Sequence, residues 1–163
     1  MRRLHVLVFA IAMLPGTLAP AQATHHTADT THDSAYAAMQ ERGRMVMGVD
    51  QYTSTHHFDD LSDGGRITLV RNVDDSTGAA HIQMHLRAIA AAFAAGDFSS
   101  PMMVHMKDVP GTDVMIAKKA AITYSVQALP RGGELTIRTR DPDAIRAVHA
   151  FLAFQRSEHH TGH

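Results

Sequence analysis

The residues of this chain best suited to chemistry are its histidines. Thirteen occur among 163 residues, together with ten methionines and no cysteine. His81 and His85 stand in the segment HIQMH, and their i, i+4 spacing places both side chains on one face of a helix. Imidazole is the commonest protein ligand for transition metals such as zinc and copper. The histidine pattern therefore points to a metal site.

Several kinds of catalytic site are excluded by residues that the chain lacks. A zinc metalloprotease needs a glutamate directly after the first histidine of its HExxH motif, and Ile82 occupies that position. The absence of cysteine excludes thiolate zinc sites, cysteine nucleophiles and covalently attached c-type haem. The glycine pairs Gly64-Gly65 and Gly132-Gly133 lack the lysine and the helix start of a phosphate-binding loop. We expect copper or zinc as the cofactor, and neither haem c nor a nucleotide.

Two similar segments must position the histidines. Residues 54–72 and 122–140 align without gaps on their Gly-Gly pairs, at an offset of 68. In each, apolar residues alternate with period two on both sides of the glycines, which predicts a strand, a glycine turn and a second strand. A helical pattern follows each hairpin, so the repeats cover about 54–96 and 122–156.

Both of these helices have clear end signals. The first is expected to begin near Asp75-Ser76 and to end at Gly96. The second begins at Asp141-Pro142, which is a capping residue followed by proline at the first helical position. The chain should therefore contain the unit ββα twice.

The duplicated unit predicts the fold class. It is α+β, a duplicated ββα unit that forms a four-stranded antiparallel sheet with two helices on one face. Residues 35–47 predict an additional N-terminal helix, although Gly43 interrupts its pattern. A short helix around residues 113–119 is expected between the repeats.

Alignment of the repeats predicts which histidines face inward. His56 aligns with Tyr124 in the apolar alternation of its strand, and His85 aligns with Phe151 on the second helix. A duplicated unit normally fills equivalent positions with equivalent hydrophobic residues, so imidazole at both positions is a functional signal. We expect His56 and His85 to form the centre of a metal site, with His57 on the opposite face of its strand.

Three further histidines are candidate ligands. His105 stands among three methionines in the segment MMVHM and is the natural third donor. Thioether sulfur beside imidazole would favour Cu(I) over zinc. His149, near the apolar face of the second helix, and His81 are the alternates.

The two ends of the chain differ in composition from its middle. Residues 1–23 combine two arginines, an apolar run and the small-residue site AQA, as in a secretory signal peptide. Residues 24–34 predict a disordered arm, and residues 159–163 predict a polar, histidine-rich tail. We expect residues 35–158 to form one domain that is periplasmic or secreted, with no membrane segment once the signal is removed.

Four segments carry a resemblance to a known family. They are MGVDQYTSTHHF, HLRAIAAAFAAGDF, LPRGGELTIRTRDPDA and VHAFLAFQR. On them the chain resembles a family of small exported bacterial proteins of unknown activity, some members of which are labelled aspartate carbamoyltransferase. About 140 residues remain after the signal, too few for that enzyme's two-domain catalytic chain, and its carbamoyl-phosphate loop is missing. The resemblance therefore implies family membership and no mechanism.

Three functions remain open on the sequence alone. The first is a periplasmic module that binds copper or zinc through His56, His85 and His105. The second is a non-catalytic domain with structural histidines that forms a homodimer through its free sheet face. The third is a small enzyme with a His56–His85 acid–base pair. Nucleic acid is not an expected partner, because the net charge is −1 with neutral histidines and no basic run is present.

Overall fold

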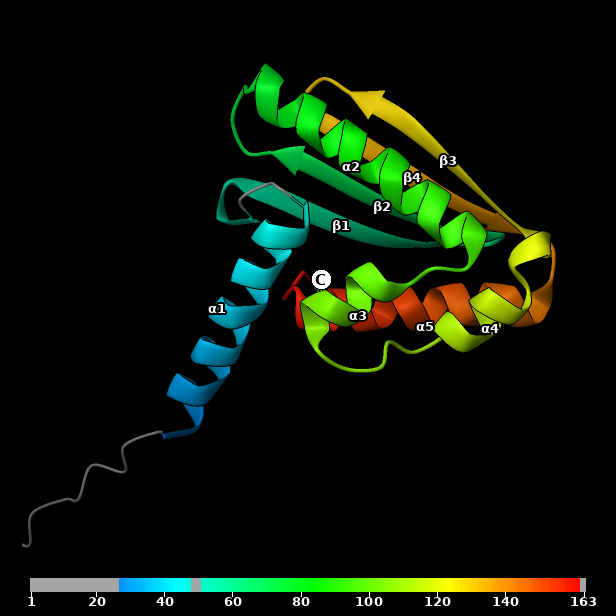
Figure 1. The fold of residues 1–163 in the computed structure, drawn as a ribbon, viewed down its shortest axis with the longest axis horizontal. Coiled ribbons are helices and arrows are strands. Elements are labelled where there is room, and N and C mark those ends of the chain that lie inside the picture. Colours follow the sequence, from blue (N-terminus) through cyan, green and yellow to red (C-terminus); the bar gives the residue numbers. More distant parts are fainter. Residues whose placement is uncertain (1–26, 48–50, 162–163) are drawn as a thin grey trace, which may run out of the picture.

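A computed structural model describes residues 27–47 and 51–161. The signal peptide expected at residues 1–23 and the end of the tail at residues 162–163 lie outside this part of the chain. The longer elements, in chain order (Figure 1), are α1 (Thr27–Met47), β1 (Ser54–Leu61), β2 (Gly64–Arg71), α2 (Ser76–Ala95), α3 (Ser99–His105), α4 (Thr112–Ala117), β3 (Ile122–Leu129), β4 (Gly132–Thr139) and α5 (Pro142–Glu158). Two 3-10 turns, Gln51–Thr53 and Lys119–Ala121, precede β1 and β3. The predicted class, α+β, is confirmed.

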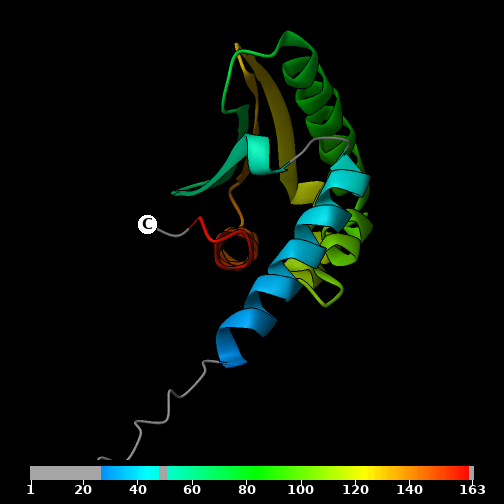
Figure 2. The ribbon, with the colours of Figure 1, turned by 90° about the vertical axis from the view of Figure 1, so that its left-hand side faces the viewer.

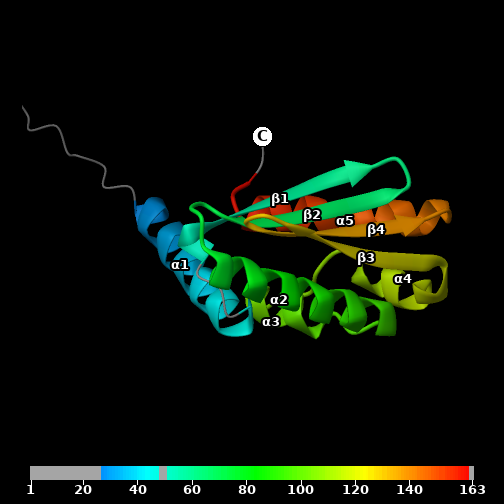
Figure 3. The same cartoon turned by 90° about the horizontal axis from the view of Figure 1, so that it is seen from above.

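The four strands form one antiparallel sheet in the order β1-β2-β4-β3 (Figure 3). The two hairpins meet at the central pair β2–β4, where Ile67 lies opposite Leu135. These two residues are equivalent in the sequence alignment, at the offset of 68. The sheet therefore has an approximate two-fold axis at its centre, as a duplicated ββα unit requires.

Both long helices cover the same face of the sheet, and each lies mainly over the other unit's hairpin. α2 packs on β4 and β3, whereas α5, seen end-on in Figure 2, packs on β1 and β2. Glycine allows this close approach: a Cβ at Gly65 would lie 2.2 Å from Leu152 of α5, and one at Gly133 would lie 2.9 Å from Leu86 of α2.

The glycine pairs were expected to form the hairpin turns, and this prediction is wrong. The turns are at residues 62–63 and 130–131, and each glycine pair begins the second strand of its hairpin. Gly64 and Gly132 bring neighbouring backbones together, because a Cβ on either would lie about 2 Å from a carbonyl oxygen of the adjacent strand. The sequence shows only that two glycines are adjacent. The register of the sheet shows which backbone segment of the neighbouring strand packs against them.

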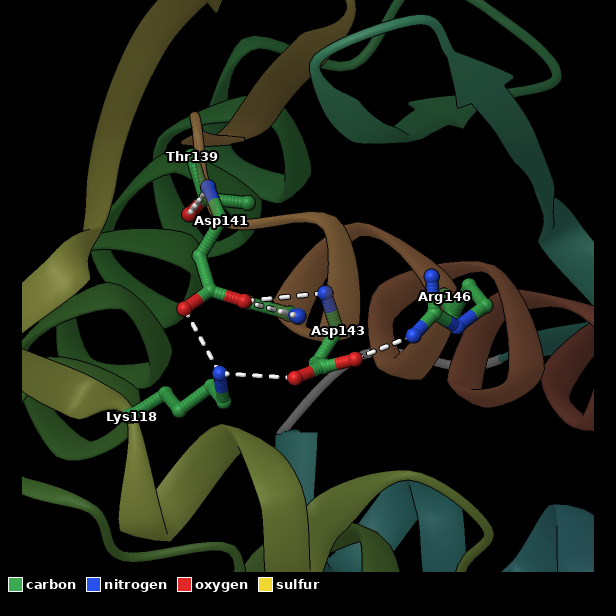
Figure 4. A network of polar contacts seen from close by, with 6 residues as sticks. Lys118, Thr139, Asp141, Asp143 and Arg146 are labelled. Carbon is green, nitrogen blue, oxygen red and sulfur yellow. Dashed lines mark hydrogen bonds and ion pairs between the residues drawn. The ribbon is translucent and has the colours of Figure 1, made fainter.

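The predicted helix ends are confirmed for α2 and α5. Asp75 accepts a hydrogen bond from the Gly78 N–H at 2.9 Å, and Gly96 ends α2 in the left-handed conformation. Asp141 accepts from the N–H groups of Asp143 and Ala144, and its carboxylate also binds Lys118 of the α4 end (Figure 4). These contacts fix the start of α5 against the short helices.

Two expectations about the chain ends need correction. Residues 27–34, predicted to be a disordered arm, belong to α1; extending an existing helix adds one hydrogen bond per residue and needs no new nucleus. His159, expected in an exposed polar tail, is only 8% exposed. The helix α5 continues to Glu158, and His159 is the residue that caps its C-terminal end. The segment expected to be a tail therefore begins as part of the folded domain.

Between the two units, the chain forms helix where the sequence suggested only an apolar segment. α3 contains His105 at its last position, and α4 occupies residues 112–117, close to the short helix expected at 113–119. α1 packs against α3, and Arg42 donates to the Val104 carbonyl oxygen at 2.7 Å. α4 in turn packs against α5.

The opposite face of the sheet is polar. Its side chains include Arg66, which pairs with Asp59 at 2.9 Å and approaches Glu134 at 3.9 Å. The outward positions of β1 and β2 also include Thr55, His57 and Thr68. No helix in the described part of the chain combines the length and the apolar character needed to cross a membrane.

Candidate functional site

Four histidines from four different parts of the fold line one cavity. His56 comes from β1, His85 from α2, His105 from the end of α3 and His159 from the end of α5. The volume open to water-sized molecules is about 90 Å³. The remaining lining is largely apolar, and includes Phe58, Leu69, Leu86, Phe93 and Phe151. The cavity lies between the sheet and the helical layer, which is why most of its walls are hydrophobic.

The rings of three of these histidines form a continuous cluster, which we call the imidazole cluster: His56, His105 and His159. His159 is the central member. Its ring centroid lies 4.9 Å from that of His56, with the planes 30° apart, and 5.3 Å from that of His105, with the planes 87° apart. All three side chains are buried.

Two ring nitrogens of the cluster are buried without a hydrogen-bond partner. They are Nδ1 of His105 and Nδ1 of His159. The other nitrogen of His105, Nε2, donates to Oε1 of Gln155 at 3.1 Å. Buried polar atoms are normally satisfied, and an unsatisfied one costs about 1–3 kcal/mol. Nδ1 of His159 has no polar partner among the described residues, whereas Nδ1 of His105 lies 3.6 Å from Oε2 of Glu158.

Burial keeps these imidazoles neutral. Loss of solvent lowers the pKa of His56 to about 4 and that of His159 to about 2, and the neighbouring histidines add to both effects. Burial also lowers the pKa values of His85 and His105, although Gln155 and Glu158 partly oppose the shift at His105. Neutral imidazole is the form that binds a metal ion.

The other two predicted ligands lie elsewhere. His149 is half-buried, and its Nε2 donates to the carbonyl oxygens of Leu61 and Gly64 at 2.9 and 3.0 Å, so it ties α5 to the β1–β2 turn. His81 is exposed on α2. Neither lines the cavity.

The methionines around His105 also lie away from the cavity. Met102, Met103 and Met106 are 40%, 51% and 72% exposed, and none of them lines it. The described side-chain donors at the cavity are thus imidazole nitrogens, the Gln155 amide and the Ser100 hydroxyl. This removes the sequence-based reason for favouring Cu(I).

His159 was missed because the end of the chain looked polar in sequence. The signal that could have identified it is helical spacing. Leu152, Gln155 and His159 follow one another at three and four residues, which continues the buried stripe of α5 past its last turn. The polar neighbours of His159 concealed this pattern.

The cluster is not a preassembled metal site. Within residues 27–47 and 51–161, no three histidine, aspartate or glutamate side chains are placed to hold one ion as they stand. The rings contact each other face to face and edge to face, so their nitrogens do not converge on one point.

Fold and site together define the class: a small α+β protein with a buried histidine cluster in an apolar cavity. No protein-family model, curated protein or solved structure matches the chain. The resemblance to small exported bacterial proteins stays a prediction.

Proposed function

We propose that this protein is an exported metal-binding module, periplasmic or secreted, that takes one copper or zinc ion at the imidazole cluster. His56, His105 and His159 would be the ligands, and His85 the neighbouring donor. The observation that supports this most strongly is the convergence of His56, His85 and His105 on one cavity. These three histidines come from three separate segments of the sequence and line the same cavity.

Ring spacing is compatible with a shared ion. Zinc binds imidazole nitrogen at about 2.0–2.1 Å, so two rings on one ion have centroids roughly 5 Å apart. The observed centroid distances to His159 are 4.9 and 5.3 Å. Binding of one ion by all three residues would require the rings to rotate about their side-chain bonds, so that their nitrogens turn toward a common point.

The acid–base alternative also uses this cavity, since His56 and His85 both line it. A general base works best with a pKa near the operating pH. With a pKa of about 4, His56 accepts a proton poorly at neutral pH. The chemistry of the site therefore favours metal binding over proton transfer.

The test is a metal titration of the metal-free protein with Zn²⁺ and with Cu²⁺, in competition with a chromophoric chelator. We expect one tight equivalent. Mutation of a residue that only hydrogen-bonds to a metal ligand typically lowers metal affinity about 10–100-fold. Loss of a ligand itself should therefore lower the affinity ~100-fold or more. His56→Ala and His159→Ala should each show this loss.

The matched controls are His57→Ala, the exposed neighbour of His56 on β1, and His81→Ala on α2. Both should bind like the wild type. Unchanged affinity in His56→Ala and His159→Ala, or loss in the controls alone, would contradict the proposal.

A further inference from the structure

A second cavity lies on the outer side of the imidazole cluster, where α1 passes the ends of α3 and α5. It offers about 370 Å³ to water-sized molecules. Its polar and charged lining consists mainly of Tyr36, Arg42, His105, Lys107, Glu158 and His160. This cavity differs from the inner one in character, because its donors are charged or exposed.

His105 is the one described residue that lines both cavities. Its two ring nitrogens face opposite sides. Nε2 donates to Gln155, which lines the inner cavity, and Nδ1 lies 3.6 Å from Oε2 of Glu158, which lines the outer one. The ring thus forms the wall between the two spaces.

The pair His105 Nδ1 and Glu158 Oε2 already has the spacing of two metal ligands. A zinc ion binds nitrogen at about 2.0–2.1 Å and carboxylate oxygen at about 2.0–2.2 Å, which places the two donor atoms roughly 3.4–3.7 Å apart at ordinary ligand angles. The observed separation is 3.6 Å, and Nδ1 is buried without a hydrogen bond. A proton on Nδ1 or a metal ion between the two atoms would link this imidazole to the carboxylate.

Two neighbouring contacts surround His105 and Glu158. Lys107 Nζ binds the other carboxylate oxygen of Glu158 at 2.9 Å, and its own side chain is 52% exposed. An ion pair this exposed is worth little and yields readily to a divalent ion. His160 stacks on Tyr36 of α1 with ring centroids 4.3 Å apart, which places a further imidazole at the same cavity.

We propose that His105 Nδ1 and Glu158 Oε2 form a landing site for a hydrated divalent metal ion, from which the ion passes to the imidazole cluster. This inference rests on the proposed function. The outer cavity keeps the ion among polar groups during entry. The partly exposed lining of the inner cavity combines the apolar residues Val46, Ile89 and Pro101 with the polar residues His85 and Ser100, so the outer cavity offers a hydrated cation the more polar surroundings.

The test measures the rate of Zn²⁺ transfer from a weak chromophoric chelator to the metal-free protein. Glu158→Gln should slow both uptake and release about tenfold or more, with the equilibrium affinity changed less than about threefold. Lys107→Met, which removes the competing ammonium group, should speed uptake. Glu134→Gln, a carboxylate paired with Arg66 on the open face of the sheet, is the matched control and should leave the rates unchanged.

A static measurement complements the kinetics. In His56→Ala, where tight binding should be lost, a weak Zn²⁺ equivalent should remain and should disappear when Glu158→Gln is added. Wild-type uptake rates in Glu158→Gln, with tight binding intact, would overturn the landing site and leave the proposed function standing. Absence of tight binding in the wild type would overturn both.

Discussion

His159 is the central residue of the imidazole cluster. It is the member of the imidazole cluster in contact with both of the others, and its Nδ1 is buried without a partner. Its neighbours Glu158 and His160 face the outer cavity. One turn of chain at the end of α5 therefore supplies donors to both sides of His105.

The buried neutral histidines make the stability of the metal-free protein depend on pH. In the unfolded chain His56 and His159 titrate near 6.5, whereas in the folded protein their pKa values are about 4 and about 2. Below pH 6.5 the unfolded state therefore binds more protons, and stability falls as the pH falls. Each residue should contribute about 1.4 kcal/mol per pH unit to the slope of the free energy of unfolding against pH. The contribution of His56 should end near pH 4, where the folded protein also binds a proton at this residue.

Urea unfolding between pH 4.5 and 7.5, in the presence of a chelator, measures this slope. His159→Phe should lower it by about 1.4 kcal/mol per pH unit, since phenylalanine fills similar space and does not titrate. His81→Gln, on the exposed face of α2, is the control and should keep the wild-type slope. A His159→Phe variant with the full wild-type slope would contradict the assignment of His159 as a buried neutral group.

Among the elements, α5 links the β1–β2 hairpin, α4 and the cavity. It covers the β1–β2 hairpin, supports the cavity through Phe151 and Gln155, and ends at His159. Its start is fixed by Asp141, which caps the helix and binds Lys118 at 2.6 Å (Figure 4). These contacts lower the pKa of Asp141, Lys118 being the largest cause, and raise that of Lys118.

Removal of the cap should loosen α5 as a unit. Asp141→Ala loses two hydrogen bonds to backbone N–H groups and should reduce the free energy of unfolding by about 1 kcal/mol, within a usual range of about 0.5–2. Asp143→Ala is the matched control. It shares Lys118 and pairs with Arg146, but it caps no helix, and exposed ion pairs of this kind contribute little.

Urea unfolding at pH 7 compares the two variants. Asp141→Ala should lose clearly more stability than Asp143→Ala. Equal losses would mean that the ion pairs to Lys118 matter and that the cap does not.

At the scale of the whole molecule, the two ββα units depend on each other. α2 packs mainly on the β3–β4 hairpin and α5 mainly on the β1–β2 hairpin. The core is therefore built between units, with Leu86 of α2 over Gly133 and Leu152 of α5 over Gly65. Each helix touches its own unit's hairpin as well, α2 at β2 and α5 at β4, but these contacts are the smaller part.

Because each helix packs mainly on the hairpin of the other unit, we predict that neither half of the chain folds alone. Fragments covering residues 51–118 and 119–161 should each lack a cooperative thermal transition, because each hairpin would expose most of its apolar face. An equimolar mixture should regain it, and the continuous chain 51–161 is the control. Circular dichroism during heating measures the transition, and a cooperative transition in either isolated fragment would contradict the prediction.

The sequence by itself determined the four strands, the two long helices of the repeats and the order of these elements. Alternation about the glycine pairs specified the strands, and the signals at Asp75, Gly96 and Asp141 specified the ends of α2 and α5, because these depend on neighbours within one turn or one strand. Repeat equivalence also selected His56 and His85 as inward-facing. All of these are local or internally repeated properties of the chain.

Only the tertiary structure decided which helix covers which hairpin, and hence which histidines meet. His149 binds carbonyl oxygens at the β1–β2 turn and does not line the cavity, whereas His159 lines the cavity although the sequence around it is typical of a polar tail. The methionines beside His105 turned outward, because α3 buries Val104 and His105. Such contacts join residues up to about a hundred positions apart, and no local pattern encodes distances of that kind.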